Sequence, residues 1–151
     1  MKLQNLISLL KSQEDNLKNL LKIGLNKKDV LVSGDNEKLI EIIQSEEQSL
    51  LTLQLNEESR LKIMHDLFKE YNIDNERYKL KVLIENLTGK VNSKLLIAIT
   101  NSEKTIKKMI SEITRLNQLN MLLIQQSRSI INETIQAVIN SSKRSIVDRK
   151  G

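Results

Sequence analysis

Leucine and isoleucine recur at alternating three- and four-residue spacing along nearly the whole chain, and none of its 151 residues is a proline. The first of these stripes contains Leu3, Leu6, Leu10, Leu17 and Leu20. This spacing places side chains along one face of an α-helix, and a helix with one apolar stripe buries that stripe against a neighbour. The sequence therefore predicts long packed helices and an all-α chain, because no segment alternates in the way a β-strand does.

A glycine followed by two capping residues marks the end of the first helix. Gly34 can adopt the left-handed conformation that ends a helix, and a side-chain oxygen of Asp35 or Asn36 can cap the next one. The second helix is expected from about Glu37 to Glu70. Its expected apolar stripe contains Leu39, Ile43, Leu50, Leu53, Met64 and Leu67.

Two further breaks divide the rest of the chain. Residues 71–75 are expected to end the second helix, with Asp74 capping a short helix that runs through Leu87. Residues 88–92 form the other break, before one long helix from about Ser93 to Asn140. Short turns make consecutive helices antiparallel. We therefore expect an elongated antiparallel bundle or coiled coil of three long helices plus one short helix. It would form a single domain over residues 1–140, with a basic, disordered tail over residues 141–151.

The residues that usually carry catalysis or bind metals are scarce. The chain has no cysteine, one histidine (His65) and four isolated glycines. One imidazole cannot form the two-histidine face of a metal site, and isolated glycines do not build a phosphate-binding loop. Glu46, Glu47, Glu57 and Glu58 are interpreted as a solvated or ion-paired face, because a catalytic carboxylate pair needs a pocket that separates its pKa values. We expect His65 on the helix surface, no cofactor, no metal and no enzymatic activity.

The net charge of +5 is concentrated near the C-terminus, where Lys143, Arg144, Arg149 and Lys150 face a single acid, Asp148. Elsewhere acids and bases alternate, and aromatic residues make up only 2% of the chain, so nucleic-acid bases would find few stacking partners. The basic segment lacks the bulky apolar face with which a helix enters a membrane surface, and no apolar run is long enough to span one. We expect no nucleic-acid partner, no membrane insertion and a soluble intracellular protein.

The last expected helix carries polar residues at regular positions of its seam. Asn120, Ser127 and Thr134 are each seven residues apart. The apolar residues along the same seam are Leu123, Ile130 and Ala137. Such a seam suits the binding of another helix. Two interpretations stay open: the polar positions set the register of an intramolecular or homodimeric coiled coil, or they keep a partner-binding surface soluble while it is empty.

Three segments of the chain form a moderately specific set of motifs. They are KKDVLVSGDNEKL at residues 27–39, EQSLL at 47–51 with EESR at 57–60, and NQLNMLLIQQS at 117–127. Together they resemble the FlgN family of flagellar export chaperones, over a span from Leu3 to about Asn140. The chain departs from the family pattern at Arg128, where a leucine is common, and at Ile130, where a phenylalanine is frequent.

The resemblance implies an all-helical cytoplasmic chaperone that holds hook–filament junction proteins, also called hook-associated proteins, before export through the flagellar type III secretion apparatus. It implies that the C-terminal part of the chaperone binds the terminal helical segment of the client; contact with export-gate components stays open. The client-binding residues carried over are Asn120, Leu123, Ile124, Ser127, Ile130, Ile131, Thr134, Ile135 and Val138. Two alternatives are a chaperone for a filament or cap protein and, from another class, a structural coiled-coil adaptor or homodimeric scaffold without an export client.

Overall fold

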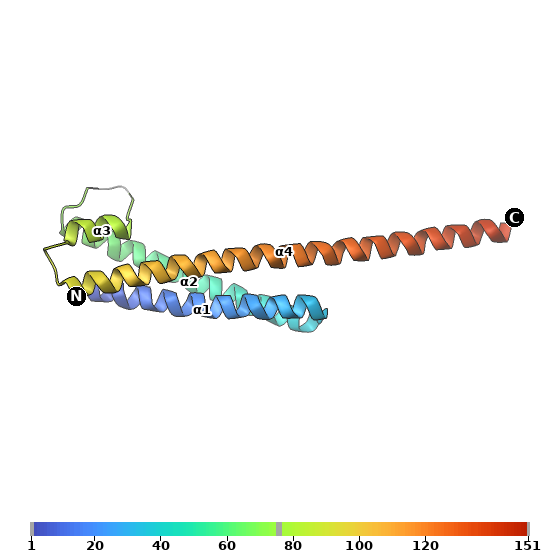
Figure 1. Cartoon of the computed structure of the whole chain (residues 1–151), viewed down its shortest axis with the longest axis horizontal. Coiled ribbons are helices and arrows are strands. Elements are labelled where there is room, and N and C mark those ends of the chain that lie inside the picture. The colour runs from blue at the N-terminus through green and yellow to red at the C-terminus, as the bar shows by residue number, and fades with distance from the viewer. Residues whose placement is uncertain (1, 75–76, 151) are drawn as a thin grey trace.

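The chain folds into long α-helices, as the computed structural model in Figure 1 shows. The structure describes residues 2–74 and 77–150, apart from the side chains of residues 127, 130, 131 and 141–150. The helices are α1 (Lys2–Ser33), α2 (Asn36–Glu70), α3 (Leu80–Leu87) and α4 (Ser93–Lys150). No strand occurs within the described ranges. The predicted all-α class is confirmed.

The turn between α1 and α2 follows the local chemistry of its sequence. Gly34 has a φ of 74°, and its N–H donates to the carbonyl of Val30 over 2.9 Å. Asp35 then caps α2, because its side-chain Oδ1 accepts a hydrogen bond from the backbone N–H of Lys38 over 3.2 Å. A glycine at the left-handed position and an aspartate at the N-cap both satisfy backbone groups that a helix end leaves unpaired. The predicted turn is confirmed.

The connection between α2 and α3 differs from expectation. Asn72 takes a left-handed φ of 53°, and the N–H of Ile73 donates back to the carbonyl of Phe68 over 2.8 Å, which closes the end of α2. The predicted cap at Asp74 is wrong, because α3 begins only at Leu80 and its N-cap residue is Lys79. The short helix begins where its leucines reach the core, and capping chemistry alone does not locate that point.

Helix α1 contacts both α2 and α4, whereas α3 packs against α4. In Figure 1, α1 and α4 start at the same end of the molecule and run in the same direction. Helix α2 runs in the opposite direction, back toward that end. At the shared end, all the helices contribute to one group of buried side chains, which we call the base cluster. Its buried members are Leu3, Leu6, Leu10, Met64, Leu67, Phe68, Leu83, Leu87, Leu96 and Ile99. Burying each such side chain contributes roughly 2 kcal/mol, so the base cluster anchors the fold.

The apolar stripe predicted for α2 is correct in part. Met64 and Leu67 are buried, and Leu53 is half-buried against Leu17 and Leu20, but Ile43 and Leu50 keep 37% and 48% of their surface exposed. Polar residues occupy the inner face instead: Ser49 is buried, and Glu46 is half-buried against Lys27 of α1 at 3.3 Å. The prediction fails here because leucine and isoleucine occur on more than one face of α2, so their spacing alone did not identify the face that meets α1.

Helix α4 is longer than the sequence predicted. The helix was expected to end near Asn140, but its backbone runs through Lys150; the disordered tail expected over residues 141–151 stays a prediction. Neither proline nor glycine occurs between Ser93 and Lys150, so no residue in that span forces the helix to stop. At 1.5 Å per residue, α4 is about 87 Å long, against about 48 Å for α1. The surplus length of α4 sets the geometry of the candidate site.

Candidate functional site

The last turns of α4 that pack on α1 do so through a glycine. A Cβ atom added at Gly24 would lie 2.7 Å from Cδ2 of Leu116, so any other residue at this position would force the Leu116 side chain to move. Leu116 is consequently buried, with 4% of its surface exposed. One turn later, the side-chain Nδ2 of Asn120 donates to the backbone carbonyl of Gly24 over 3.2 Å. Gly24, Leu116 and Asn120 mark the place where α4 leaves α1.

Beyond Asn120, the face of α4 that packs on α1 continues toward the C-terminus and past Ser33, the last residue of α1 (Figure 1). At 100° per residue, positions 123, 124, 127, 130, 131, 134, 135 and 138 lie within about 80° of the direction in which Asn120 points. We call these eight positions the distal stripe. In Figure 1, this half of α4 extends past the turn that joins α1 to α2. The thirty residues from Met121 to Lys150 add about 45 Å of helix.

The distal stripe becomes more exposed along its length. Leu123 and Ile124, next to the end of the α1 contact, are half-buried. Thr134 is exposed, and Ile135 and Val138 keep 49% and 61% of their surface accessible. The side chains of the three remaining positions, Ser127, Ile130 and Ile131, lie outside the described residues. Two large aliphatic side chains on one helical face are thus open to solvent.

Asn120 differs from the other residues that the family resemblance placed at the client-binding surface. It is 3% exposed and is bonded inside the molecule, and its Oδ1 is buried without a hydrogen-bond partner among the described residues. A buried amide with one unsatisfied atom costs stability but restricts which turn of α4 can lie on Gly24. Of the two interpretations of the polar seam residues, Asn120 therefore fits the first: it sets the register of an intramolecular contact, between α1 and α4.

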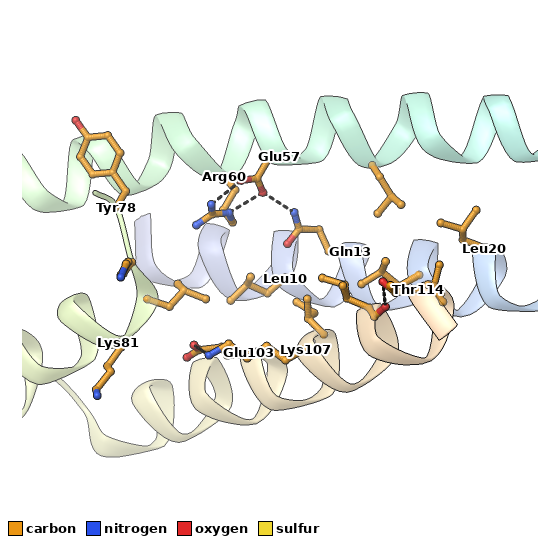
Figure 2. A pocket seen from close by; sticks show the side chains of 17 residues that line it. Leu10, Gln13, Leu20, Glu57, Arg60, Tyr78, Lys81, Glu103, Lys107 and Thr114 are labelled. Atoms are coloured by element: carbon orange, nitrogen blue, oxygen red, sulfur yellow. Dashed lines mark hydrogen bonds and ion pairs between the residues drawn. The ribbon is translucent and has the colours of Figure 1, made fainter. Parts of the chain in front are cut away.

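A second feature, which the sequence did not indicate, is a groove between α2 and α4 with α1 as its floor (Figure 2). Its volume is about 790 Å³. The apolar lining residues are Leu10, Leu17 and Leu20 of α1, Leu53 of α2, and Ile106, Ile110 and Ile113 of α4. Tyr78, Lys79, Leu80 and Lys81 line the groove as well. We call this feature the α2–α4 groove.

A polar cluster forms the α2 wall of this groove. Arg60 donates from Nε to Glu57 Oε2 over 2.8 Å and from Nη2 to Oε1 over 2.6 Å, and Gln13 Nε2 donates to Oε2 over 3.3 Å (Figure 2). The hydrogen bonds from Arg60 lower the pKa of Glu57, and the same bonds raise the pKa of Arg60. Glu57 is thus held ionised, which is the opposite of what a general acid requires. Glu46 pairs with Lys27 in a similar way, so the ion-paired interpretation of both glutamates is confirmed.

The single histidine lies on the surface of α2, as predicted. His65 keeps 59% of its side chain exposed, and its ring meets the edge of Tyr78 at a centroid distance of 5.8 Å. Within the described part of the chain, no three histidine, cysteine or acidic residues come together in a way that could hold a metal ion. Among the described residues, no helix has an apolar stretch long enough to cross a membrane.

Comparison with known proteins gives one match that covers almost the whole chain. The family model described as FlgN protein matches residues 1–147. No curated protein and no solved structure matches the chain. The matched span includes both the α2–α4 groove and every position of the distal stripe.

Proposed function

The chain belongs to the FlgN family of flagellar export chaperones, and from that premise we propose that its distal stripe binds the terminal helical segment of a hook–filament junction protein in the cytoplasm. The bound segment would be covered until the client is delivered for export. Eight of the nine residues named from the family resemblance contribute to this surface. Asn120 instead fixes where α4 leaves α1.

The observation that carries the proposal is the uncovered continuation of one helical face. Met109, Ile113 and Leu116 of α4 are buried on the face that α1 covers. On the same face of the same helix, Ile135 and Val138 are largely exposed. Apolar surface gains free energy when it leaves water, by about 25 cal/mol for each Å², so this face favours any helix that can take the place of α1.

The composition of the distal stripe suits a client that must be released. Ser127 and Thr134 interrupt the aliphatic residues at seven-residue spacing, as polar seam residues do in coiled coils where partner choice matters more than affinity. An amphipathic helix laid along a helical face is a common way of recognising a peptide segment. A terminal segment that will later pack against other subunits has an apolar face of this kind, and a temporary partner would prevent its premature assembly.

The proposal is tested by placing charge on the exposed end of the distal stripe. Ile135→Asp combined with Val138→Asp leaves two unpaired carboxylates in the interface when the client binds. Each costs several kcal/mol there, so titration calorimetry with a purified hook–filament junction protein should show affinity reduced at least a hundredfold. Both residues are more than 45% exposed in the free chain, so its thermal unfolding should be unchanged.

Met121→Asp combined with Leu122→Asp provides the matched control. These two residues are on the same helix and are 59% and 55% exposed, but at 100° per residue they fall outside the distal stripe. Client affinity should survive in this variant. An Ile135→Asp, Val138→Asp protein that binds its client as tightly as the wild type contradicts the proposal, as does an equal loss in the control.

The scaffold alternative makes a different prediction for the same variants. A homodimer that buries the distal stripe against a second copy would sediment as a dimer without any client, and Ile135→Asp with Val138→Asp would convert it to a monomer. The chaperone proposal expects a free chain whose mass does not depend on those two residues. Analytical ultracentrifugation of the wild type and the double variant separates the two functions.

A further inference from the structure

We propose that the α2–α4 groove is a second docking site, separate from the distal stripe, for an amphipathic partner helix of about three turns that carries carboxylates in its last turn. The apolar face of this helix would lie on the leucines and isoleucines of the groove. Its acidic end would meet Lys79 and Lys81 at the first turn of α3.

Helix α3 shows that a short helix can pack against α1, α2 and α4 next to the α2–α4 groove. Leu83 and Leu87 of α3 are fully buried in the base cluster, where they meet residues of α1, α2 and α4. The beginning of α3, at Leu80 and Lys81, lines the groove. Helix α3 covers the base cluster, and the groove begins where α3 begins. A partner helix placed in the groove continues an interface that α3 already makes.

The size of the groove matches a short helix. On α4 its lining runs from Glu103 to Thr114, which is about 17 Å of helix and slightly more than three turns. Ile110 lies within that stretch and keeps 49% of its surface exposed, whereas Leu10, Leu17 and Leu20 of the floor are buried. An open groove with an apolar floor is the usual receptor for the apolar face of an amphipathic helix.

The charges along the lining favour an acidic occupant. Both carboxylates of the lining are already neutralised, Glu57 by Arg60 and Glu103 by Lys107 at 2.8 Å. Lys79 and Lys81 are exposed, and neither forms an ion pair with another described residue. Within the described part of α3, the first turn holds no acidic residue and no side chain caps it, so the positive end of the helix dipole adds to the two lysines.

The same charges argue against the distal half of α4 as the occupant. From Met121 to Val147, Glu133 is the only acidic residue, and Lys143 and Arg144 follow it. The distal half of α4, whether from the same molecule or a second copy, would bring basic residues toward Lys79 and Lys81. The groove therefore fits an acidic helix of another protein better than it fits the distal half of α4.

The test uses the full-length chain and two fluorescently labelled synthetic helical peptides of about twelve residues. Both carry leucines at three- and four-residue spacing; one has glutamates in its last turn, and the other has lysines at the same positions. Fluorescence anisotropy should show the acidic peptide binding at least tenfold more tightly. Lys79→Glu combined with Lys81→Glu should reverse that preference, because it changes the sign of the charge at the end of the groove.

Two variants of α4 locate the peptide. Ile110→Asp places a charge in the groove and should reduce binding of the acidic peptide at least tenfold. Ile97→Asp changes a residue of the same helix that is 57% exposed and does not line the groove, and binding should persist. Equal affinity for the two peptides, or unchanged binding to Ile110→Asp, overturns the proposal. Loss of peptide binding in the Ile135→Asp, Val138→Asp variant also overturns it, because the peptide would then occupy the distal stripe.

Discussion

The two halves of α4 carry the same kind of apolar stripe but have opposite environments. In the proximal half, Ile99 is fully buried and Leu116 is 4% exposed. In the distal half, Ile135 and Val138 are 49% and 61% exposed. The pattern of the sequence does not change at the boundary, although α4 leaves α1 near Gly24 and then runs well beyond Ser33, where α1 ends. An amphipathic stripe therefore predicts which face of a helix will be covered, and leaves open whether the covering residues belong to the same chain.

The largest expected difference between the halves is in stability, and the chain offers a matched pair of substitutions. Ile99→Ala should lower the free energy of unfolding by about 3 kcal/mol, because it leaves a cavity in the base cluster. Ile135→Ala makes the same chemical change on the same helix but should alter stability by less than about 0.5 kcal/mol. Urea denaturation followed by circular dichroism measures both values. Similar losses from the two substitutions would mean that the distal half is packed in the free chain.

A smaller effect is expected at the boundary between the halves. Gly24→Ala ordinarily favours a helix by about 1 kcal/mol, but the added Cβ would lie 2.7 Å from Cδ2 of the buried Leu116. Overpacking costs about 1–3 kcal/mol, so we expect a net loss of about 1 kcal/mol in the same denaturation experiment.

Asn26→Ala is the control for Gly24→Ala, because Asn26 is exposed on the same turn of α1. It should stabilise the chain slightly through helix propensity alone. A Gly24→Ala protein that gains as much stability as that control would show that α1 and α4 can separate at this point without cost, and the boundary between the two halves of α4 would then need to be placed earlier.

The smallest effect is expected at the Glu57–Arg60 ion pair on the α2 wall of the groove. Its size tests whether polar contacts, as well as apolar ones, stabilise the part of the molecule that contains the proximal half of α4. Hydrogen bonds from Arg60 lower the pKa of Glu57 below its ordinary value, so the ionised carboxylate stabilises the fold above the pKa of the unfolded chain. That contribution is lost as the pH falls through the lower pKa of the folded state. Glu57→Gln should therefore cost less than about 1 kcal/mol at pH 7, because the pair is partly exposed.

The cost of Glu57→Gln should disappear as the pH falls below about 4, the ordinary range of a glutamate pKa. Thermal unfolding of the wild type and the variant across this pH range measures the difference. A cost that is constant with pH would show that the Gln13 and Arg60 contacts, and not the charge of Glu57, hold the α2 wall in place. A large cost at neutral pH would show that the ion pair is as important to the bundle as the base cluster.

Local signals in the sequence predicted more of this fold than long-range ones. Gly34 and Asp35 determine their turn through their own backbone conformation and side-chain oxygen, so the turn was predictable. The stripe from Leu3 to Leu20 is regular and was predicted correctly. The inner face of α2 was not, because the packing of Ser49 depends on residues of α1 more than twenty positions away. The α2–α4 groove was missed for the same reason, since it exists only when three helices and the start of α3 are assembled.

The candidate client-binding residues show the same division. The seven-residue spacing of Asn120, Ser127 and Thr134 identified one seam, but it could not reveal that the first of these residues is buried against Gly24 of α1. Burial of Asn120 against Gly24 depends on which turns of α1 and α4 meet. No pattern within α4 itself encodes that alignment.

The parallel alignment of α1 and α4 has a mechanical consequence. A load applied to the distal half along the axis of α4 pulls that helix lengthwise past α1, so the contacts from Ile99 to Asn120 resist it in shear and must yield together. A sideways load at the same place peels α4 from α1, beginning at Asn120 and breaking one turn at a time. A helix bound at the proposed client-binding surface and pulled along that axis would therefore load the contacts between α1 and α4 in the direction in which they resist most.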